Sequence, residues 1–184
     1  MLRAFSLRNV ISVLNENNGG ESKMSYDFSQ KSKERFLSIF SAGVFFIILG
    51  VVFVGTPGLI DNTIAFFQDF KIVRVPKVSF EISLPAPANP GNYSNVYSAA
   101  ALFCFSWGIF LAVLLGLRLF ARSPLKKKAD ATSDIVFWLV GGFLINNFLN
   151  ATTTHAMWFS FWAAIVVLIG VTLIIRAAIL AIFR

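Results

Sequence analysis

Four long apolar runs constrain the fold of this chain more than any other feature of its sequence. The runs that contain no charged residue are 36–54, 96–117, 135–149 and 156–175. A bilayer core about 30 Å thick requires roughly 20 residues of α-helix. Three runs approach or exceed that length, whereas 135–149 has only fifteen residues. Because a helix in a soluble core is rarely apolar on every side, the runs predict an all-α membrane protein with four transmembrane helices.

The composition agrees with this class of protein. Hydrophobic residues make up 57% of the chain and charged residues only 14%, whereas soluble domains have about 45–50% and 25%. The single cysteine, Cys104, excludes an internal disulfide and a metal cluster built on cysteines.

Lysine and arginine residues predict the orientation of the helices. If the chain crosses the membrane four times with both termini in the cytoplasm, only Lys71, Arg74 and Lys77 of its 16 Lys and Arg residues fall outside. Segments rich in Lys and Arg remain in the cytoplasm. If the short run 135–149 did not span, Arg176 and Arg184 would be exported. The cations therefore predict a protein of the plasma membrane with four spans and cytoplasmic termini.

Six of these cations mark the predicted cytoplasmic ends of the helices. A long cationic side chain at such an end places its methylenes along lipid and its charge among the headgroups. The predicted membrane-interface anchors are Arg118, Arg122, Lys126, Lys127, Lys128 and Arg176. The alternative for Arg176 is a functional charge or a pair with Asp134. The lysine cluster is expected to contact anionic lipid headgroups rather than nucleic acid.

Aromatic and histidine residues near the other predicted ends suggest contact with the membrane surface. Tyr97, Trp158 and Trp162 are placed where aromatic belts form. His155 follows three threonines at the outer boundary, where a lone histidine is expected to be solvated.

The segments outside the runs differ in character. Residues 1–30 are polar and rich in turn formers, which predicts a mobile cytoplasmic tail before the transmembrane domain 31–184. Met24 is an alternative start.

Residues 56–95 are predicted to form a small extracellular cap. Apolar positions in 59–70 have helical spacing, which is typical of an amphipathic interfacial helix. Strict alternation in 78–84 predicts a strand, paired in a hairpin with 71–75 and followed by a proline-rich linker.

Small residues on the second run indicate a helix-packing face. Gly108, Ala112 and Gly116 recur every fourth residue and therefore stack on one side of a helix. Such spacing lets another helix approach closely, either within the chain or in a dimer.

Asn146 and Asn147 are strongly polar adjacent residues within a predicted span. Successive helical residues point about 100° apart, so the two side chains do not face one partner. Two interpretations remain open, an interhelical hydrogen bond and a polar path for a substrate or water.

No pattern in the sequence indicates catalysis. None of the apolar runs contains Asp or Glu, and proton-coupled transporters usually place carboxylates there. Glycine-rich phosphate loops and the usual hydrolase and metalloprotease motifs are missing from the sequence as well. We therefore expect no catalytic residues, no metal site, no cofactor and no enzyme activity.

Several stretches resemble a group of small, uncharacterised archaeal membrane proteins with four helices and no known activity. They are "RVPKVSFEISLPAPANPG", "VYSAAALFCFSWGIF", "ARSPLKKKA", "DIVFWLVGGFLI" and "FWAAIVVLIGVTLIIRA". The resemblance covers roughly residues 33–181. It implies a prokaryotic plasma membrane and assigns no ligand or catalytic residue.

These features predict a non-catalytic, multi-pass membrane protein that serves as an accessory, assembly or envelope subunit. Its partners would be the lipid bilayer and either a second copy of itself or another membrane protein. The alternative function is a small oligomeric permease or channel for a small solute.

Overall fold

The computed structural model describes residues 35–76, 81–120 and 125–182. The predicted tail 1–30, the anchor Arg122 and residues 78–80 of the predicted strand lie outside these ranges. The chain divides into two compact units, 1–46 and 47–184, and the boundary falls within its first helix.

Three helices among the described residues are long and apolar enough to cross a membrane. They are Arg35–Gly55, Pro90–Leu119 and His155–Ile182. Few residues in the apolar windows of these segments are buried. Lipid tails are as apolar as leucine, so a membrane helix loses nothing by leaving such side chains unburied. The described part of the chain is thus helical, with three candidate membrane spans.

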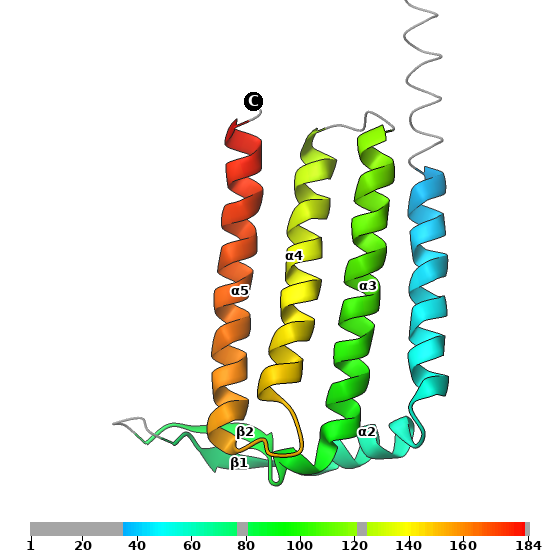
Figure 1. Ribbon diagram of the computed structural model, residues 1–184. Coiled ribbons are helices and arrows are strands. Elements are labelled where there is room, and N and C mark those ends of the chain that lie inside the picture. Colours follow the sequence, from blue (N-terminus) through cyan, green and yellow to red (C-terminus); the bar gives the residue numbers. More distant parts are fainter. Residues whose placement is uncertain (1–34, 77–80, 121–124, 183–184) are drawn as a thin grey trace, which may run out of the picture. The chain divides into compact units, whose positions relative to one another are not determined.

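Unit 47–184 contains three long helices that run side by side and alternate in direction (Figure 1). These are α3 (Ser94–Phe120), α4 (Leu125–Phe148) and α5 (His155–Ile182). Helix α4 contacts both α3 and α5. It begins at Leu125, ten residues before the predicted span 135–149, and most of these ten residues are polar or charged. This charged beginning distinguishes α4 from the three apolar helices.

Helix α2 (Leu59–Gln68) lies where the sequence predicted an amphipathic helix. The turn before it needs a residue with positive φ, and Gly58 adopts φ 67° there. Glycine reaches this region without steric cost. The Gly58 carbonyl then accepts a hydrogen bond from the Asn62 amide at 3.0 Å, which starts the helix.

The two strands, β1 (Phe70–Arg74) and β2 (Ser83–Pro87), form an antiparallel sheet. The segment that was expected to be a proline-rich linker is therefore partly strand: Pro85 pairs with Ile72 and Pro87 with Phe70. In a two-stranded sheet every strand is an edge strand, and an edge strand tolerates proline where its missing N–H would face away from the ladder. The observed strand consequently lies further along the chain than the predicted 78–84.

The main buried core lies at the end of α3, α4 and α5 where α2 and the sheet pack. Its buried residues are Ala86, Tyr97, Leu149, Trp158 and Phe161. The expectation that Tyr97 and Trp158 belong to an exposed aromatic belt is wrong, because they are only 3% and 4% exposed. Trp162, in contrast, is 51% exposed.

Candidate functional site

The α3–α4 contact depends on Gly108, one of the three small residues singled out in the sequence. A Cβ atom at this position would lie 2.6 Å from Leu139 Cδ2 and 3.3 Å from the Leu139 backbone nitrogen. Real Cβ atoms essentially never come within 3.0 Å of another heavy atom, so a side chain at this position would force Leu139 to shift. Gly108 is therefore a packing residue within this chain.

The other two small residues do not take part in this contact. Gly116 has open space around the position of a Cβ atom, and Ala112 is exposed. The second close approach is made instead by Gly142 of α4. A Cβ atom there would lie 3.1 Å from Cys104 Cβ and 3.4 Å from the Ala101 carbonyl oxygen. Because adjacent glycines in 141–142 gave no regular spacing, the sequence analysis did not identify this position.

Asn146 and Asn147 are both exposed on α4. The Asn147 side chain donates a hydrogen bond from Nδ2 to Phe143 O of its own helix at 2.8 Å. Within the described residues, the Asn146 side chain makes no hydrogen bond. Neither asparagine side chain therefore forms a hydrogen bond between two helices in the described part of the chain.

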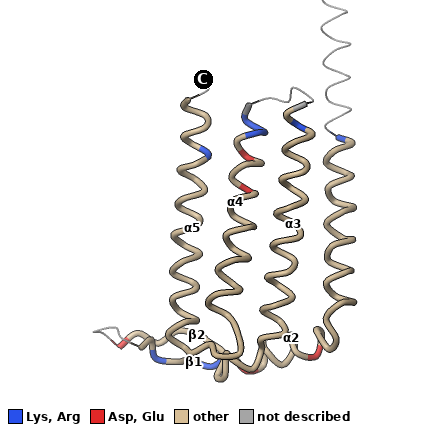
Figure 2. Tube along the Cα trace, viewed as in Figure 1, with Lys and Arg blue, Asp and Glu red and all other residues tan. Residues whose placement is uncertain are grey.

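The described charged residues of α3, α4 and α5 lie toward one end of these helices, and those of α2 and the sheet region lie at the other end (Figure 2). At the end opposite the sheet, Arg118 lies in the last turn of α3, and Lys126, Lys127 and Lys128 lie in the first turn of α4. The five predicted anchors that the structure describes therefore lie at the same end of the helices. They are Arg118, Lys126, Lys127, Lys128 and Arg176.

Arg176 forms an ion pair with Asp130 of α4 rather than with Asp134. Its Nε atom lies 2.6 Å from Asp130 Oδ1, and both side chains are partly exposed. Asp130 Oδ1 is itself enclosed by protein but accepts no well-aligned hydrogen bond, so the contact is mainly ionic. Asp130 lies before the predicted span, which begins at residue 135, and so was not among the predicted site residues. Helical spacing from Lys126 through Asp130 to Asp134 would have been the signal.

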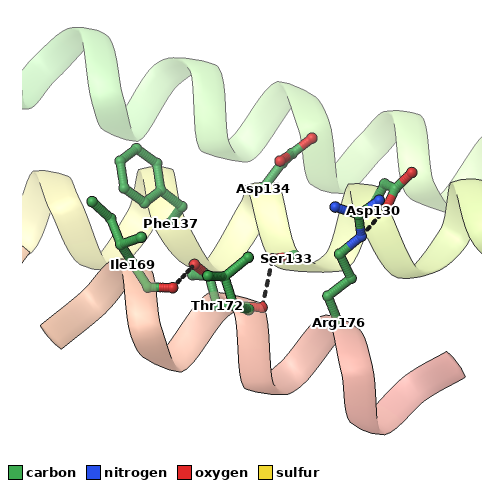
Figure 3. A pocket seen from close by; sticks show the side chains of 8 residues that line it. Asp130, Ser133, Asp134, Phe137, Ile169, Thr172 and Arg176 are labelled. Carbon is green, nitrogen blue, oxygen red and sulfur yellow. Dashed lines mark hydrogen bonds and ion pairs between the residues drawn. The ribbon is translucent and has the colours of Figure 1, made fainter. Parts of the chain in front are cut away.

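The α4–α5 pocket is a cavity of about 470 Å³ at this charged end (Figure 3). Two buried hydroxyl groups lie in its wall. Ser133 Oγ donates to Thr172 O at 2.8 Å, and Thr172 Oγ1 donates to Ile169 O at 2.8 Å. The residues that line the pocket are Asp130, Ser133, Asp134, Phe137, Ile169, Thr172, Leu173 and Arg176. Acidic, basic, hydroxyl and apolar groups therefore meet in one space.

At the other end, aromatic rings join α2 and the sheet to the long helices. Phe66 of α2 contacts Tyr97 of α3 and Trp158 of α5, with ring centroids 6.0 Å apart in both pairs. The Tyr97 hydroxyl and Trp158 Nε1 are buried without a hydrogen-bond partner among the described residues. Ring packing therefore joins α2 to α3 and α5.

Polar and backbone contacts add to the junction at its edge. His155 Nε2 lies 3.1 Å from Pro87 O, so the imidazole carries its proton on that nitrogen and donates it. His155 is half-buried, in contrast to the expectation of a solvated residue. A Cβ atom at Gly91 would lie 2.6 Å from Ala151 O, so the short helix η1 (Pro90–Tyr93) also packs tightly on the α4–α5 turn.

Within the described residues, no three side chains of His, Cys, Asp or Glu come together as a metal site would require. Comparison with known protein families finds no match, and comparisons with curated proteins and with solved structures find none either. The geometry of the two helix ends is thus what the functional proposal rests on.

Proposed function

We propose that this chain is a non-catalytic, multi-pass membrane protein, an accessory, assembly or envelope subunit that acts through helix packing and through a cap formed by residues 56–95. The observation that carries the proposal is the junction of α2 and the sheet with the long helices. Ala86 and Tyr97 are buried there at 0% and 3% exposure. Because the cap is packed onto the helices at this junction, it keeps one conformation and offers a fixed surface to a partner protein.

The proposal includes four membrane crossings. Helix α4 has 24 residues and lies between α3 and α5, antiparallel to both. At about 1.5 Å per residue it is long enough to cross. If α3 and α5 span the bilayer, α4 has to cross with them. The cations Arg118, Lys126 and Arg176 then favour the cytoplasm for the charged end. The cap would lie outside the plasma membrane, which we infer to be archaeal from the resemblance.

The sheet is the part of the cap that best fits a protein partner. Ile72 of β1 is 81% exposed, and among the described residues each strand has one edge without a neighbouring strand. An exposed edge can receive a strand from another protein, with backbone hydrogen bonds providing affinity and side chains providing specificity. Ile72 would supply the apolar contact of such an interface.

Co-purification from the native membrane in mild detergent tests this role. We expect a partner protein to remain bound to the wild-type chain and to be lost from Ile72→Asp. The matched control is Lys71→Asp, which adds the same carboxylate one residue away, on the opposite side of the strand. Equal retention of the partner by both variants, or a wild-type chain that purifies without any partner, would reject the accessory role.

A small oligomeric permease or channel is the second candidate, and the α4–α5 pocket favours it because a polar cavity reaches between two long helices. Asn146 and Asn147 would extend such a path from an exposed face of α4. Solute flux in liposomes separates the two functions. A homo-oligomer whose flux disappears in Asn146→Leu but persists in Val140→Leu, an exposed position on the same helix, supports the permease.

A further inference from the structure

The lining of the α4–α5 pocket changes in polarity along the helices. The ion pair of Arg176 lies nearest the charged end, the two hydroxyl groups lie about one turn further, and Phe137 and Ile169 lie about one turn beyond them (Figure 3). Leu173 follows Thr172 in the sequence and adds an apolar side chain at the level of the hydroxyl groups. A polar headgroup followed by a hydrocarbon chain has the same order of polarity. The volume of about 470 Å³ is within the usual range for small-molecule sites.

The charge of the pocket is not balanced by its own residues. The carboxylate of Asp130 balances the positive charge of Arg176 in their ion pair. Asp134, in contrast, makes no hydrogen bond or ion pair within the described residues. Arg118 and Arg176 act on the Asp134 carboxylate only at longer range. In Figure 3 the dashed ion pair joins Arg176 to Asp130 and leaves Asp134 aside. One carboxylate in the wall is therefore available to a cation.

The two hydroxyl groups indicate what kind of cation fits. Ser133 and Thr172 each donate their proton to a backbone carbonyl, so their remaining lone pairs can only accept hydrogen bonds. Both residues are more than nine-tenths buried, at 8% and 7% exposure. A carboxylate together with hydroxyl acceptors matches a group that only donates. A primary ammonium, with three donors and one positive charge, is such a group.

We propose that the α4–α5 pocket binds an amphiphile with a primary ammonium group, which lies at Asp134 while its hydrocarbon chain lies against Phe137, Ile169 and Leu173. An ethanolamine phospholipid carries such an ammonium group next to its phosphate. The same recognition of an ammonium would extend to a soluble alkylamine. This binding is independent of the accessory role proposed above.

Native mass spectrometry of the full chain in detergent tests the site. Phosphatidylethanolamine and phosphatidylglycerol with identical chains are offered at equal concentration. We expect the wild-type protein to retain the ethanolamine lipid about fivefold more, since a partly exposed charge pair contributes up to about 1 kcal/mol. In Asp134→Asn the two lipids should bind equally. Asp61→Asn, the same change on α2 at the far end of unit 47–184, should keep the preference.

Two further variants keep the test decisive if Asp134→Asn does not fold. Asp130→Asn removes the partner of Arg176, so the freed guanidinium should shift the preference toward phosphatidylglycerol. Leu173→Trp fills the apolar part of the pocket and should reduce binding of both lipids. Equal binding of the two lipids by the wild-type chain, or an ethanolamine preference that survives in a folded Asp134→Asn, would overturn the proposal.

Competition with n-butylammonium identifies the source of the amine. If millimolar butylammonium displaces the ethanolamine lipid from the wild-type chain but not from Leu173→Trp, the pocket accepts a soluble alkylamine. If the lipid stays bound, the pocket requires the complete lipid. Displacement that is equally strong in Asp134→Asn would contradict the role of this carboxylate.

Discussion

Two glycines determine how closely α3 and α4 approach, and neither acts through flexibility. Gly108 faces Leu139 and Gly142 faces Cys104, and a Cβ atom would lie 2.6 Å from Leu139 Cδ2 in the first case and 3.1 Å from Cys104 Cβ in the second. Without a hydrophobic driving force between helices in lipid, such van der Waals contact is a main source of association. The sequence pattern singled out Gly108 as a small residue on a helix face. It could not show that Gly116 has open space beside it, because regular spacing does not reveal which turns of a helix face a neighbour contacts.

Substitution of the two glycines of α3 should therefore have different effects. We expect Gly108→Leu to lower the free energy of unfolding by about 1–3 kcal/mol or more, because it overpacks a closed interface. Gly116→Leu should leave it nearly unchanged, since nothing lies within 4 Å of its Cβ position. Thermal melting in detergent measures both. Equal destabilisation would contradict the packing described for α3 and α4, and a loss of oligomers in Gly116→Leu alone would assign the open face to association.

At the scale of elements, the sequence predicted the helices well wherever an apolar run coincided with a whole helix. It placed the third helix at 135–149, whereas α4 starts at Leu125. The first ten residues of α4 are polar and charged, so hydropathy does not distinguish them from a loop. Consequently the sequence predicts Arg176 as a lipid anchor and does not reveal its ion pair with Asp130. The pocket between α4 and α5 could not be predicted either, because Asp130, Ser133 and Asp134 in its wall belong to this polar part of α4.

The cap shows which tertiary contacts a sequence pattern does not reveal. Strict alternation in 78–84 predicted a strand, but the observed β2 extends through Pro85 and Pro87. Tyr97 and Trp158 were expected at a lipid surface because they lie near helix ends. They are buried because α2 places Phe66 against both rings. Only the folding of the cap onto the helices decides that outcome.

A pair of adjacent phenylalanines in α2 tests this docking. Phe66 contacts five other aromatic rings, whereas Phe67 is 68% exposed. We expect Phe66→Ala to destabilise the protein by about 2 kcal/mol or more, as loss of a packed aromatic side chain does. It should also make residues 56–95 more sensitive to limited proteolysis. Phe67→Ala should change neither readout, and similar effects of the two substitutions would show that α2 is not anchored through Phe66.

At the scale of the whole molecule, the account depends on the direction of α4 through the membrane. The three apolar helices would give an odd number of crossings by themselves. In the proposed topology, helix α4, with charged residues at one end and the turn beside the cap at the other, makes the number even. The positions of the charged end and of the cap on opposite sides of the bilayer follow from this crossing. The partner surface proposed for the cap and the lipid site proposed for the charged end both require it.

Labelling of single cysteines in intact cells with a membrane-impermeant maleimide tests that crossing most directly. In a Cys104→Ala background, Thr152→Cys probes the α4–α5 turn and Lys126→Cys probes the beginning of α4, and both positions are exposed. We predict that Thr152→Cys is labelled from outside and that Lys126→Cys is labelled only after the cells are opened. Labelling of both positions from the same side would mean that α4 does not cross the membrane, and the account would be wrong.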